Sequence, residues 1–457
     1  MSNDVADLAY LAAAVCFIAA LKALSSPRRA RLGNAVGAAG ALIAVIVVFV
    51  AERPDNLLPI LGALLVGGAA GLVSAQRVAM TAMPQMVAVF NALGGAAGAI
   101  VALVELYHNA EGASRGQLAV AGFTILIGSV AFSGSMIAFL RLQALMTGRP
   151  LIFPGMRWIF GALLAAALVA GVWIPFGASL WVAVLLTVVS LAVGVLFVLP
   201  VGGADVPIVI ALLNAFSGIT VAASGYVLSN SLLIVAGTLV GASGALLTQL
   251  MAKAMGRSVG NILFGAFAGG STLGAAAVSE RPVRAAGPED VAIQLGYARR
   301  VVVAPGYGLA VAQAQHALRD LADELESRGV EVLYAIHPVA GRMPGHMNVL
   351  LAEADVPYDK LKDMEHINPE FRTTDVALVV GANDVVNPAA RNAPGSPIYG
   401  MPILAADEAQ SIVFLKRSMR AGFAGIENDL MHDPKTTLLF GDAKESLRKL
   451  VAAVKAL

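Results

Sequence analysis

The chain of 457 residues is 58% hydrophobic and 13% charged, with a formal net charge of +1. Soluble domains carry about 25% charged residues, so this composition excludes a wholly soluble protein. The balanced charge also argues against a nucleic-acid partner. The single cysteine, Cys16, excludes a disulfide within the chain and a cysteine-based metal site. We therefore expect a protein surrounded by membrane lipid that binds neither nucleic acid nor metal.

Charged residues divide the chain into two regions. Residues 1–260 contain 19 charged side chains, whereas the shorter remainder contains 42. The first composition is typical of a bundle of membrane helices, and the second is typical of a globular domain. We expect a transmembrane domain at 1–260, a linker at 261–290 and a globular domain at 291–457.

Nine segments of the first region are apolar and long enough to cross a bilayer, which takes about 20 residues in a helix. They lie at residues 5–24, 34–51, 57–76, 84–106, 118–140, 158–175, 178–200, 207–228 and 232–254. Lys and Arg near the ends of spans stay on the cytoplasmic side. They gather after the first, third, fifth and ninth segments, as in Arg29, Arg77, Arg141 and Lys253. This pattern predicts an N-terminus outside and a C-terminal domain in the cytoplasm.

The predicted spans contain small-residue clusters and an internal repeat. Clusters at 67–71 and 94–98 favour close helix packing. Residues 84–95 resemble residues 207–218, and the two segments run in the same direction across the membrane. Repeats in transporters often place the transport pathway at their interface.

Asn91 and Asn214 occupy equivalent positions in this repeat. An Asn in hydrocarbon is costly unless it is paired. The two side chains either form interhelical hydrogen bonds or belong to a polar pathway for a small ion, most simply a proton. No charged residue or histidine lies near the middle of a predicted span. A proton pathway would therefore need a titratable group from a partner chain.

The second region alternates strands and helices, which predicts a Rossmann-like, doubly wound parallel sheet. We expect strands at 299–305, 331–337, 376–381, 411–416 and 437–440, and helices at 308–328 and 443–455. A glycine-rich turn joins the first strand to the first helix. Its sequence is Gly306-Tyr307-Gly308-Leu309-Ala310-Val311, which departs from GxGxxG at the last position. Such a turn lets backbone approach the pyrophosphate of a dinucleotide.

The ends of two other strands indicate which dinucleotide is bound. The second strand ends at His337, where an NAD site normally has an acid. Lys416, Arg417 and Ser418 follow another strand and would bind an extra phosphate. Two cations at a strand end also fit a solvated turn, but the missing acid favours a 2′-phosphate pocket and therefore NADP(H).

Four further segments are candidates for nucleotide contact. They are Val339, Ala340, Gly341 and Arg342; Gly381, Ala382, Asn383 and Asp384; Gly422, Phe423, Ala424 and Gly425; and Gly441, Asp442 and Ala443. The first segment either covers the pyrophosphate or is an ordinary connector. Asp384 is either a turn cap or a titratable group beside the nicotinamide. The composition of the third segment is typical of a mobile lid.

Several long stretches in these segments resemble the sequences of a single family, and the resemblance extends over the whole chain. They are residues 306–315, 337–348, 381–384 and 416–419. With them, the chain resembles the beta subunit of the proton-translocating NAD(P) transhydrogenase. The resemblance implies an NADP(H)-binding domain on a proton-conducting membrane domain. It also implies hydride transfer from NADH, which a partner alpha subunit holds, in a dimer of alpha–beta units in a bacterial-type inner membrane.

The resemblance also implies roles for particular residues. Lys416, Arg417 and Ser418 would hold the 2′-phosphate, and the Arg342 loop would lie over the nucleotide. Asp384 would link protonation to nucleotide binding. The loop with Phe423 would close over NADP(H), although the family often has Tyr there.

Position 91 of this chain is Asn, whereas some members of the family have a proton-carrying histidine there. Other members place that histidine on the alpha side. We therefore expect the titrating residue on the partner chain, with Asn91 and Asn214 in supporting hydrogen bonds. No side chain of this chain would act in hydride transfer itself.

Two other functions fit parts of the sequence. An NADP-regulated ion channel or transporter would use the globular domain as a sensor, but such sensors usually keep an acid after the second strand. A membrane-anchored NADP reductase would need haem or flavin ligands, and no His pair occurs in the predicted spans.

Overall fold

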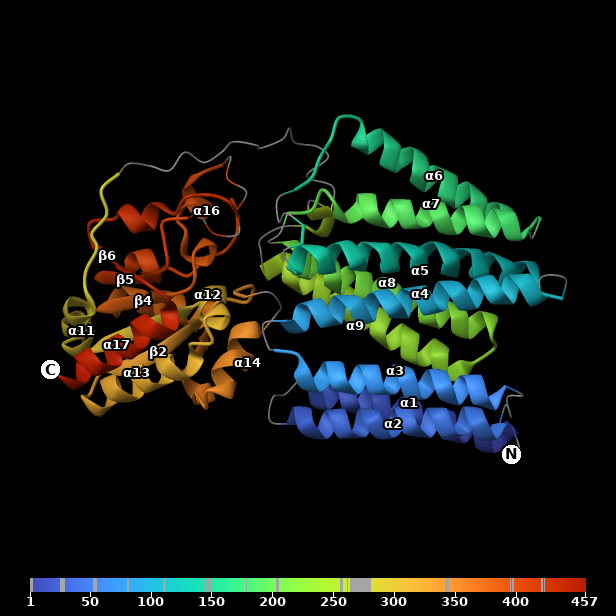
Figure 1. The fold of residues 1–457 in the computed structure, drawn as a ribbon, viewed down its shortest axis with the longest axis horizontal. Coiled ribbons are helices and arrows are strands. Elements are labelled where there is room, and N and C mark those ends of the chain that lie inside the picture. Colours follow the sequence, from blue (N-terminus) through green and yellow to red (C-terminus); the bar gives the residue numbers. More distant parts are fainter. Residues whose placement is uncertain are drawn as a thin grey trace.

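The structure is a computed structural model in which the helical bundle precedes an α/β domain (Figure 1). It describes residues 3–24, 29–51, 56–79, 82–109, 112–143, 145–146, 150–177, 179–202, 205–254, 258–260, 262–263, 281–341, 345–394, 396, 398–420, 422 and 424–457. The bundle and the α/β domain lie next to each other along the longest axis of the molecule.

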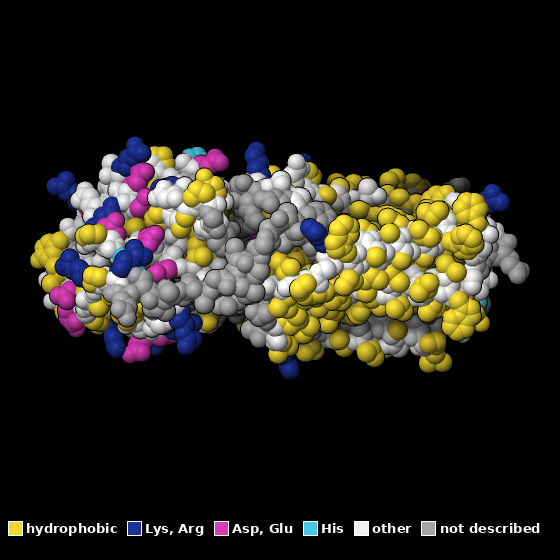
Figure 2. All heavy atoms as spheres, turned by 90° about the horizontal axis from the view of Figure 1, so that it is seen from above, with side chains coloured by type: hydrophobic (Ala, Val, Ile, Leu, Met, Phe, Trp, Pro, Cys, Tyr) yellow, Lys and Arg dark blue, Asp and Glu magenta, His cyan; other side chains and the backbone are white. Residues whose placement is uncertain are grey.

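Within these residues, nine helices are long and apolar enough to cross a membrane. They are α1 (Asn3–Leu24), α2 (Ala30–Ala51), α3 (Leu57–Arg77), α4 (Met83–Asn109), α5 (Arg115–Leu142), α6 (Met156–Trp173), α7 (Leu180–Val198), α8 (Val206–Val227) and α9 (Ser231–Ala254). Figure 2 shows apolar side chains along the sides of the bundle, while charged ones gather on the α/β domain. The predicted membrane helices are confirmed.

Small residues allow the central helices to approach closely. A Cβ atom at Gly95 of α4 would lie 2.8 Å from the carbonyl oxygen of Gly128 in α5. A Cβ at Gly98 would lie 2.4 Å from Thr220 in α8. The cluster at 67–71 differs, because a Cβ at its glycines would meet nothing within 4 Å among the described residues. The close packing expected of that cluster is therefore not found within the described part of the chain.

The α/β domain is built on one parallel sheet with the strand order β3-β2-β1-β4-β5-β6. The strands are β1 (Arg300–Pro305), β2 (Glu331–Ile336), β3 (Leu361–Asp363), β4 (Val376–Val380), β5 (Ser411–Lys416) and β6 (Thr436–Phe440). The five predicted strands are confirmed, and β3 is an addition at one edge. The order places β1, β4 and β5 side by side, so the ends of these strands meet at one edge of the sheet.

Helices and short turns cover both faces of the sheet. The α-helices are α11 (Pro288–Gly296), α12 (Tyr307–Val311), α13 (Gln315–Ser327), α14 (His346–Glu353), α15 (Met364–Ile367), α16 (Ala389–Asn392) and α17 (Ala443–Lys455). The 3₁₀-helices are η4 (Tyr358–Lys360), η5 (Asn368–Thr373), η6 (Asp384–Val386), η7 (Ala406–Glu408) and η8 (Asp429–His432). One core contains Leu318 and Leu447 from α13 and α17, and the core on the other face contains Phe371 and Leu430.

Two helix predictions need correction. The single helix expected at 308–328 is broken into α12 and α13, because Gln313 adopts a left-handed backbone with φ of 50°. A left-handed residue cannot continue a right-handed helix. Helix α11 is an addition, since no helix was expected between the linker and the first strand.

The bundle and the α/β domain share an apolar cluster. Ile208 and Met251, at the ends of α8 and α9, join Ile398 and Met401 from the loop before β5. This contact places the carboxyl edge of the sheet against one end of the bundle.

Candidate functional site

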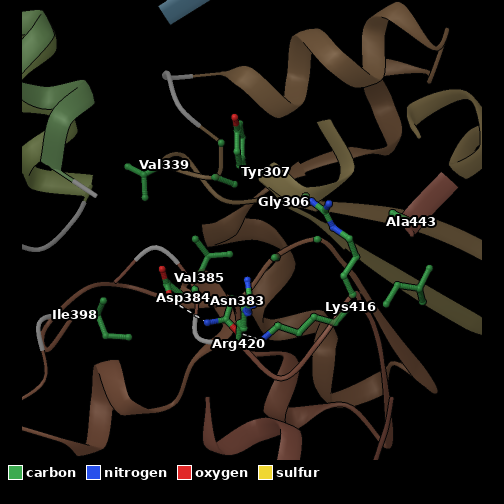
Figure 3. A pocket seen from close by; sticks show the side chains of 18 of the residues that line it. Gly306, Tyr307, Val339, Asn383, Asp384, Val385, Ile398, Lys416, Arg420 and Ala443 are labelled. Atoms are coloured by element: carbon green, nitrogen blue, oxygen red, sulfur yellow. Dashed lines mark hydrogen bonds between the residues drawn. The ribbon is translucent and has the colours of Figure 1, made fainter. Parts of the chain in front are cut away.

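A cavity of about 500 Å³ opens at the carboxyl edge of the sheet. It brings together most of the residues that the sequence singled out. These are Gly306, Tyr307, Gly308, Val339, Ala340, Gly341, Gly381, Ala382, Asn383, Asp384, Lys416, Arg417, Ser418, Gly422, Gly441 and Ala443. In the view of Figure 3, Asn383 and Asp384 lie between Ile398 and Lys416.

The glycine-rich turn packs directly against the end of β4. Gly306 N donates to the carbonyl oxygen of Val380 over 2.9 Å, and Gly308 N donates to that of Gly381 over 2.8 Å. A Cβ atom at Gly306 would lie 2.4 Å from Ala382 Cα. Gly381 has φ of 67°, a left-handed conformation that glycine adopts without strain. Glycines therefore let the turn and the end of β4 approach each other closely. They also leave the backbone of the turn uncovered by side chains, so that a ligand can approach it.

Lys416 ends β5 and is held by its neighbours. Its Nζ donates to Asn383 Oδ1 over 3.1 Å and lies 3.5 Å from Met431 Sδ. Burial lowers the pKa of Lys416 to about 8, against the opposing effects of Asp384 and Glu427. Arg417 and Ser418 are exposed. The end of β5 thus offers one half-buried ammonium, one guanidinium and one hydroxyl group.

Asp384 joins the cavity wall to the segment at Gly422–Gly425. Its Oδ1 accepts from Asn383 Nδ2 over 3.0 Å, and its Oδ2 accepts from Ala424 N over 2.9 Å. Asn383 also accepts from Lys416, so a continuous line of hydrogen bonds runs from Lys416 to Ala424. A change in the charge of Asp384 would therefore act on Lys416 and on this segment together.

His337 directly follows β2 and is buried and neutral. One ring nitrogen, Nε2, lies 2.8 Å from the carbonyl oxygen of Pro402, and Val339 N lies 3.2 Å from the other, Nδ1. These contacts fit a neutral ring that donates from Nε2 and accepts at Nδ1. Burial lowers the pKa of His337 to about 4, against the raising effect of the Pro402 carbonyl. The strand end where an acid would exclude a 2′-phosphate is therefore occupied by a neutral side chain.

Several of the singled-out residues lie outside the cavity wall. Leu309 and Ala310 are buried in the core, and Val311 is exposed on α12. Asp442 caps α17 by accepting from Lys444 N and Glu445 N. Ala424 and Gly425 are not among the lining residues, although Ala424 N donates to Asp384. Arg342 and Phe423 fall outside the described residues.

The cavity has further walls that sequence reasoning missed. Its other lining residues are Leu142, Pro207, Ile208, Met251, Val385, Ile398, Met401, Leu415 and Arg420. Arg420 follows the Lys416-Arg417-Ser418 segment by two residues, and this closeness could have identified it. The first four belong to the membrane helices, and no local pattern in the sequence shows which loop they face.

In the bundle, Asn91 is buried and paired. Its Nδ2 donates to Ser135 Oγ over 2.8 Å, and its backbone oxygen accepts from Ser217 Oγ over 3.2 Å. These bonds join α4, α5 and α8. Asn214 is half-buried, and its side chain makes no comparable hydrogen bond among the described residues.

Comparison with known proteins identifies relatives of the whole chain. The family model described as NAD(P) transhydrogenase beta subunit matches residues 6–453. Two curated relatives named NAD(P) transhydrogenase subunit beta, one from Rhodospirillum rubrum and one from a named strain of that species, are each 46% identical over 463 residues. Each match covers 99% of this chain and 100% of the relative.

Proposed function

Because the chain belongs to the family of NAD(P) transhydrogenase beta subunits, we propose that its α/β domain is the NADP(H) site of the enzyme. The chain is one subunit of a membrane enzyme that works with an alpha subunit. In this proposal the alpha subunit holds NAD(H), and hydride passes directly between the two nucleotides. The nicotinamide supplies the hydride chemistry, while the protein binds and orients it.

The observation that carries the proposal is the line Lys416–Asn383–Asp384–Ala424 in a cavity whose β2 edge carries the neutral His337. Lys416, Arg417 and Ser418 would hold the 2′-phosphate by charge-assisted bonds. Backbone at Gly306 and Gly308 would approach the pyrophosphate. The lack of a side chain at either residue also lets this turn pack against Gly381 and Ala382. The polar groups therefore suit a dinucleotide that carries an extra phosphate.

Coupling to protons would act through the same line of hydrogen bonds. We place the α/β domain in the cytoplasm and the N-terminus outside, because basic residues gather at the loops on the nucleotide-domain side. Asp384 would change the closure of the Gly422–Gly425 segment when its protonation changes. Asn91 and Asn214 would support a proton path whose titrating residue lies on the alpha subunit. The whole enzyme would be a dimer of alpha–beta units.

The test is transhydrogenation in sealed inverted membrane vesicles that contain both subunits. NADPH should reduce an NAD analogue, and the reaction should change the pH inside the vesicles. An ionophore that dissipates the gradient should change the turnover rate. Hydride transfer with no pH change and no ionophore effect would contradict proton coupling. Equal affinity of this chain for NAD(H) and NADP(H) would contradict the assignment of the cofactor.

A further inference from the structure

A second cavity lies at the end of the bundle away from the α/β domain, near the turn between α4 and α5 (Figure 1). Its volume is about 320 Å³. Its polar lining includes Glu105, His108 and Asn109 from α4 and Gln117 from α5, and Val227 of α8 lies at its wall. In a chain that spans the membrane, this cavity faces the aqueous phase opposite the nucleotide domain.

Glu105 and His108 are the titratable groups of the cavity lining. Asn109 Nδ2 donates to Glu105 Oε1 over 2.9 Å, which fixes the carboxylate. The Gln117 side chain does not bond to Glu105. Its Oε1 instead accepts from Ser114 N in the cap of α5. The amides therefore hold the cavity's shape, and the carboxylate and imidazole remain to exchange protons with water.

Few other charged or titratable groups belong to the helix ends around this cavity. Tyr107 of α4 packs edge to face with the His108 ring at 4.8 Å. Arg115 begins α5 and lies 5.8 Å above the ring of Phe176. Tyr226 of α8 approaches Gly116. Among the described residues, the outer end of α7 adds no charged side chain.

Polar groups continue from this cavity toward the middle of the bundle. Glu105, Gly98 and Asn91 are spaced seven residues apart on one face of α4, which spans about 21 Å at 1.5 Å per residue. On α8, Ser224 is buried, and its hydroxyl has no partner among the described residues. Thr220 lies against Gly98, and Ser217 donates to Asn91. Buried hydroxyls without partners are rare and suggest a bound water or ion.

We propose that the Glu105–His108 cavity is the outer proton-exchange site of this chain. The inference rests on the proposed function, because it needs protons to cross the bundle. The Glu105 carboxylate takes a proton from hydronium and leaves a water molecule, and it returns the proton to water when the direction reverses. His108 adds a second exchanging group at the open mouth. Ser224 and Thr220 then lead from the cavity toward Asn91.

The experiment uses the complete alpha–beta enzyme in sealed proteoliposomes, with the pH set separately on each side. Glu105→Gln should lower the proton flux about 10-fold, because a charged cleft raises the local proton supply by at least that factor. It should also weaken the dependence of flux on the pH of the compartment that this cavity faces. Glu105→Asp keeps a carboxylate and should restore both. The matched control is Tyr107→Phe, which should behave as wild type.

Each outcome decides between the proposals. The affinity for NADP(H) should be the same in Glu105→Gln and wild type, which shows an intact nucleotide site. Wild-type flux and an unchanged pH profile in Glu105→Gln would overturn the exchange site. Equal losses in Glu105→Gln and Glu105→Asp would overturn it as well, because the carboxylate would then not be the group required. A wild-type enzyme that moves no protons would instead contradict the proposed function.

Discussion

The carboxylate of Asp384 accepts a hydrogen bond from the backbone amide of Ala424 over 2.9 Å. Asp384 begins η6, which is the next element after β4, whereas Ala424 belongs to a segment that follows β5. One acid thus connects the cavity wall to the segment at Gly422–Gly425. The same acid accepts from Asn383, which Lys416 also contacts. Protonation of this carboxylate would weaken its bonds to both sides at once.

Asp384→Asn should loosen the segment at Gly422–Gly425. The aspartate accepts through both oxygens, whereas an asparagine side chain offers one acceptor oxygen. Loss of one hydrogen bond to a charged group costs about 1.5 kcal/mol or more, so NADP(H) should leave about 10-fold faster. Stopped-flow release of NADPH measures this rate. Asp359→Asn, at an exposed position, is the control. An unchanged release rate and unchanged proton-coupled turnover would remove Asp384 from the coupling mechanism.

Lys416→Ala should weaken NADP(H) binding while leaving any NAD(H) binding nearly unchanged. A charge-assisted bond contributes about 1.5–3 kcal/mol, so the loss should be about 10- to 100-fold. Titration calorimetry on the solubilised enzyme measures both nucleotides. Lys449→Ala removes an exposed lysine of α17 and should change neither affinity. Equal losses for the two nucleotides would mean that Lys416 does not contact the 2′-phosphate.

NADP(H) affinity should also depend on pH through Lys416. Burial lowers the pKa of this lysine to about 8, and an anionic phosphate binds the protonated form. Affinity should therefore fall as the pH rises through about 8. Lys416→Arg should abolish this fall, because a guanidinium stays protonated throughout that range. A wild-type affinity that stays constant from pH 7 to 9 would contradict the assignment.

The sequence predicts the sheet well where strands are buried on both faces. Strand β4 is a continuous apolar run between polar residues, and such runs indicate buried parallel strands. Strand β3 was missed because it has only three residues, two of them charged, at the edge of the sheet. The broken helix was missed because a left-handed residue such as Gln313 leaves the apolar spacing unchanged.

The candidate site, too, could be predicted only in part. Residues at strand ends, such as Lys416 and Asp384, could be predicted because parallel strands bring their carboxyl ends to one edge. The wall made by Leu142 and Met251 could not be, because it depends on how the α/β domain lies against the membrane helices. That arrangement comes from contacts between residues far apart in the sequence.

Gly306→Ala should destabilise the α/β domain and weaken NADP(H) binding. The added Cβ would lie 2.4 Å from Ala382 Cα and 2.5 Å from the Gly381 carbonyl oxygen, and both are backbone atoms that yield little. Such overpacking costs about 1–3 kcal/mol. Gly296→Ala is the control, since its Cβ would meet only the flexible end of Leu457. Thermal unfolding of the solubilised enzyme should show a lower midpoint for the first variant only. A midpoint equal to that of wild type would mean that the backbone of Gly381 and Ala382 can shift to make room.

The α/β domain should lose stability in mild acid through His337. Burial lowers the pKa of His337 to about 4, whereas in the unfolded chain it has its ordinary value near 6.5. Between these values the unfolded state binds more protons, so stability falls as the pH drops from about 6.5 to about 4. The full effect is on the order of 3 kcal/mol. His337→Gln keeps a donor toward Pro402 and cannot titrate, so it should remove this part of the pH dependence. His316→Gln, at an exposed position, should leave it intact. Unfolding midpoints of the three proteins between pH 7.5 and 4.5 measure the effect, and parallel curves would show that His337 is not the group responsible.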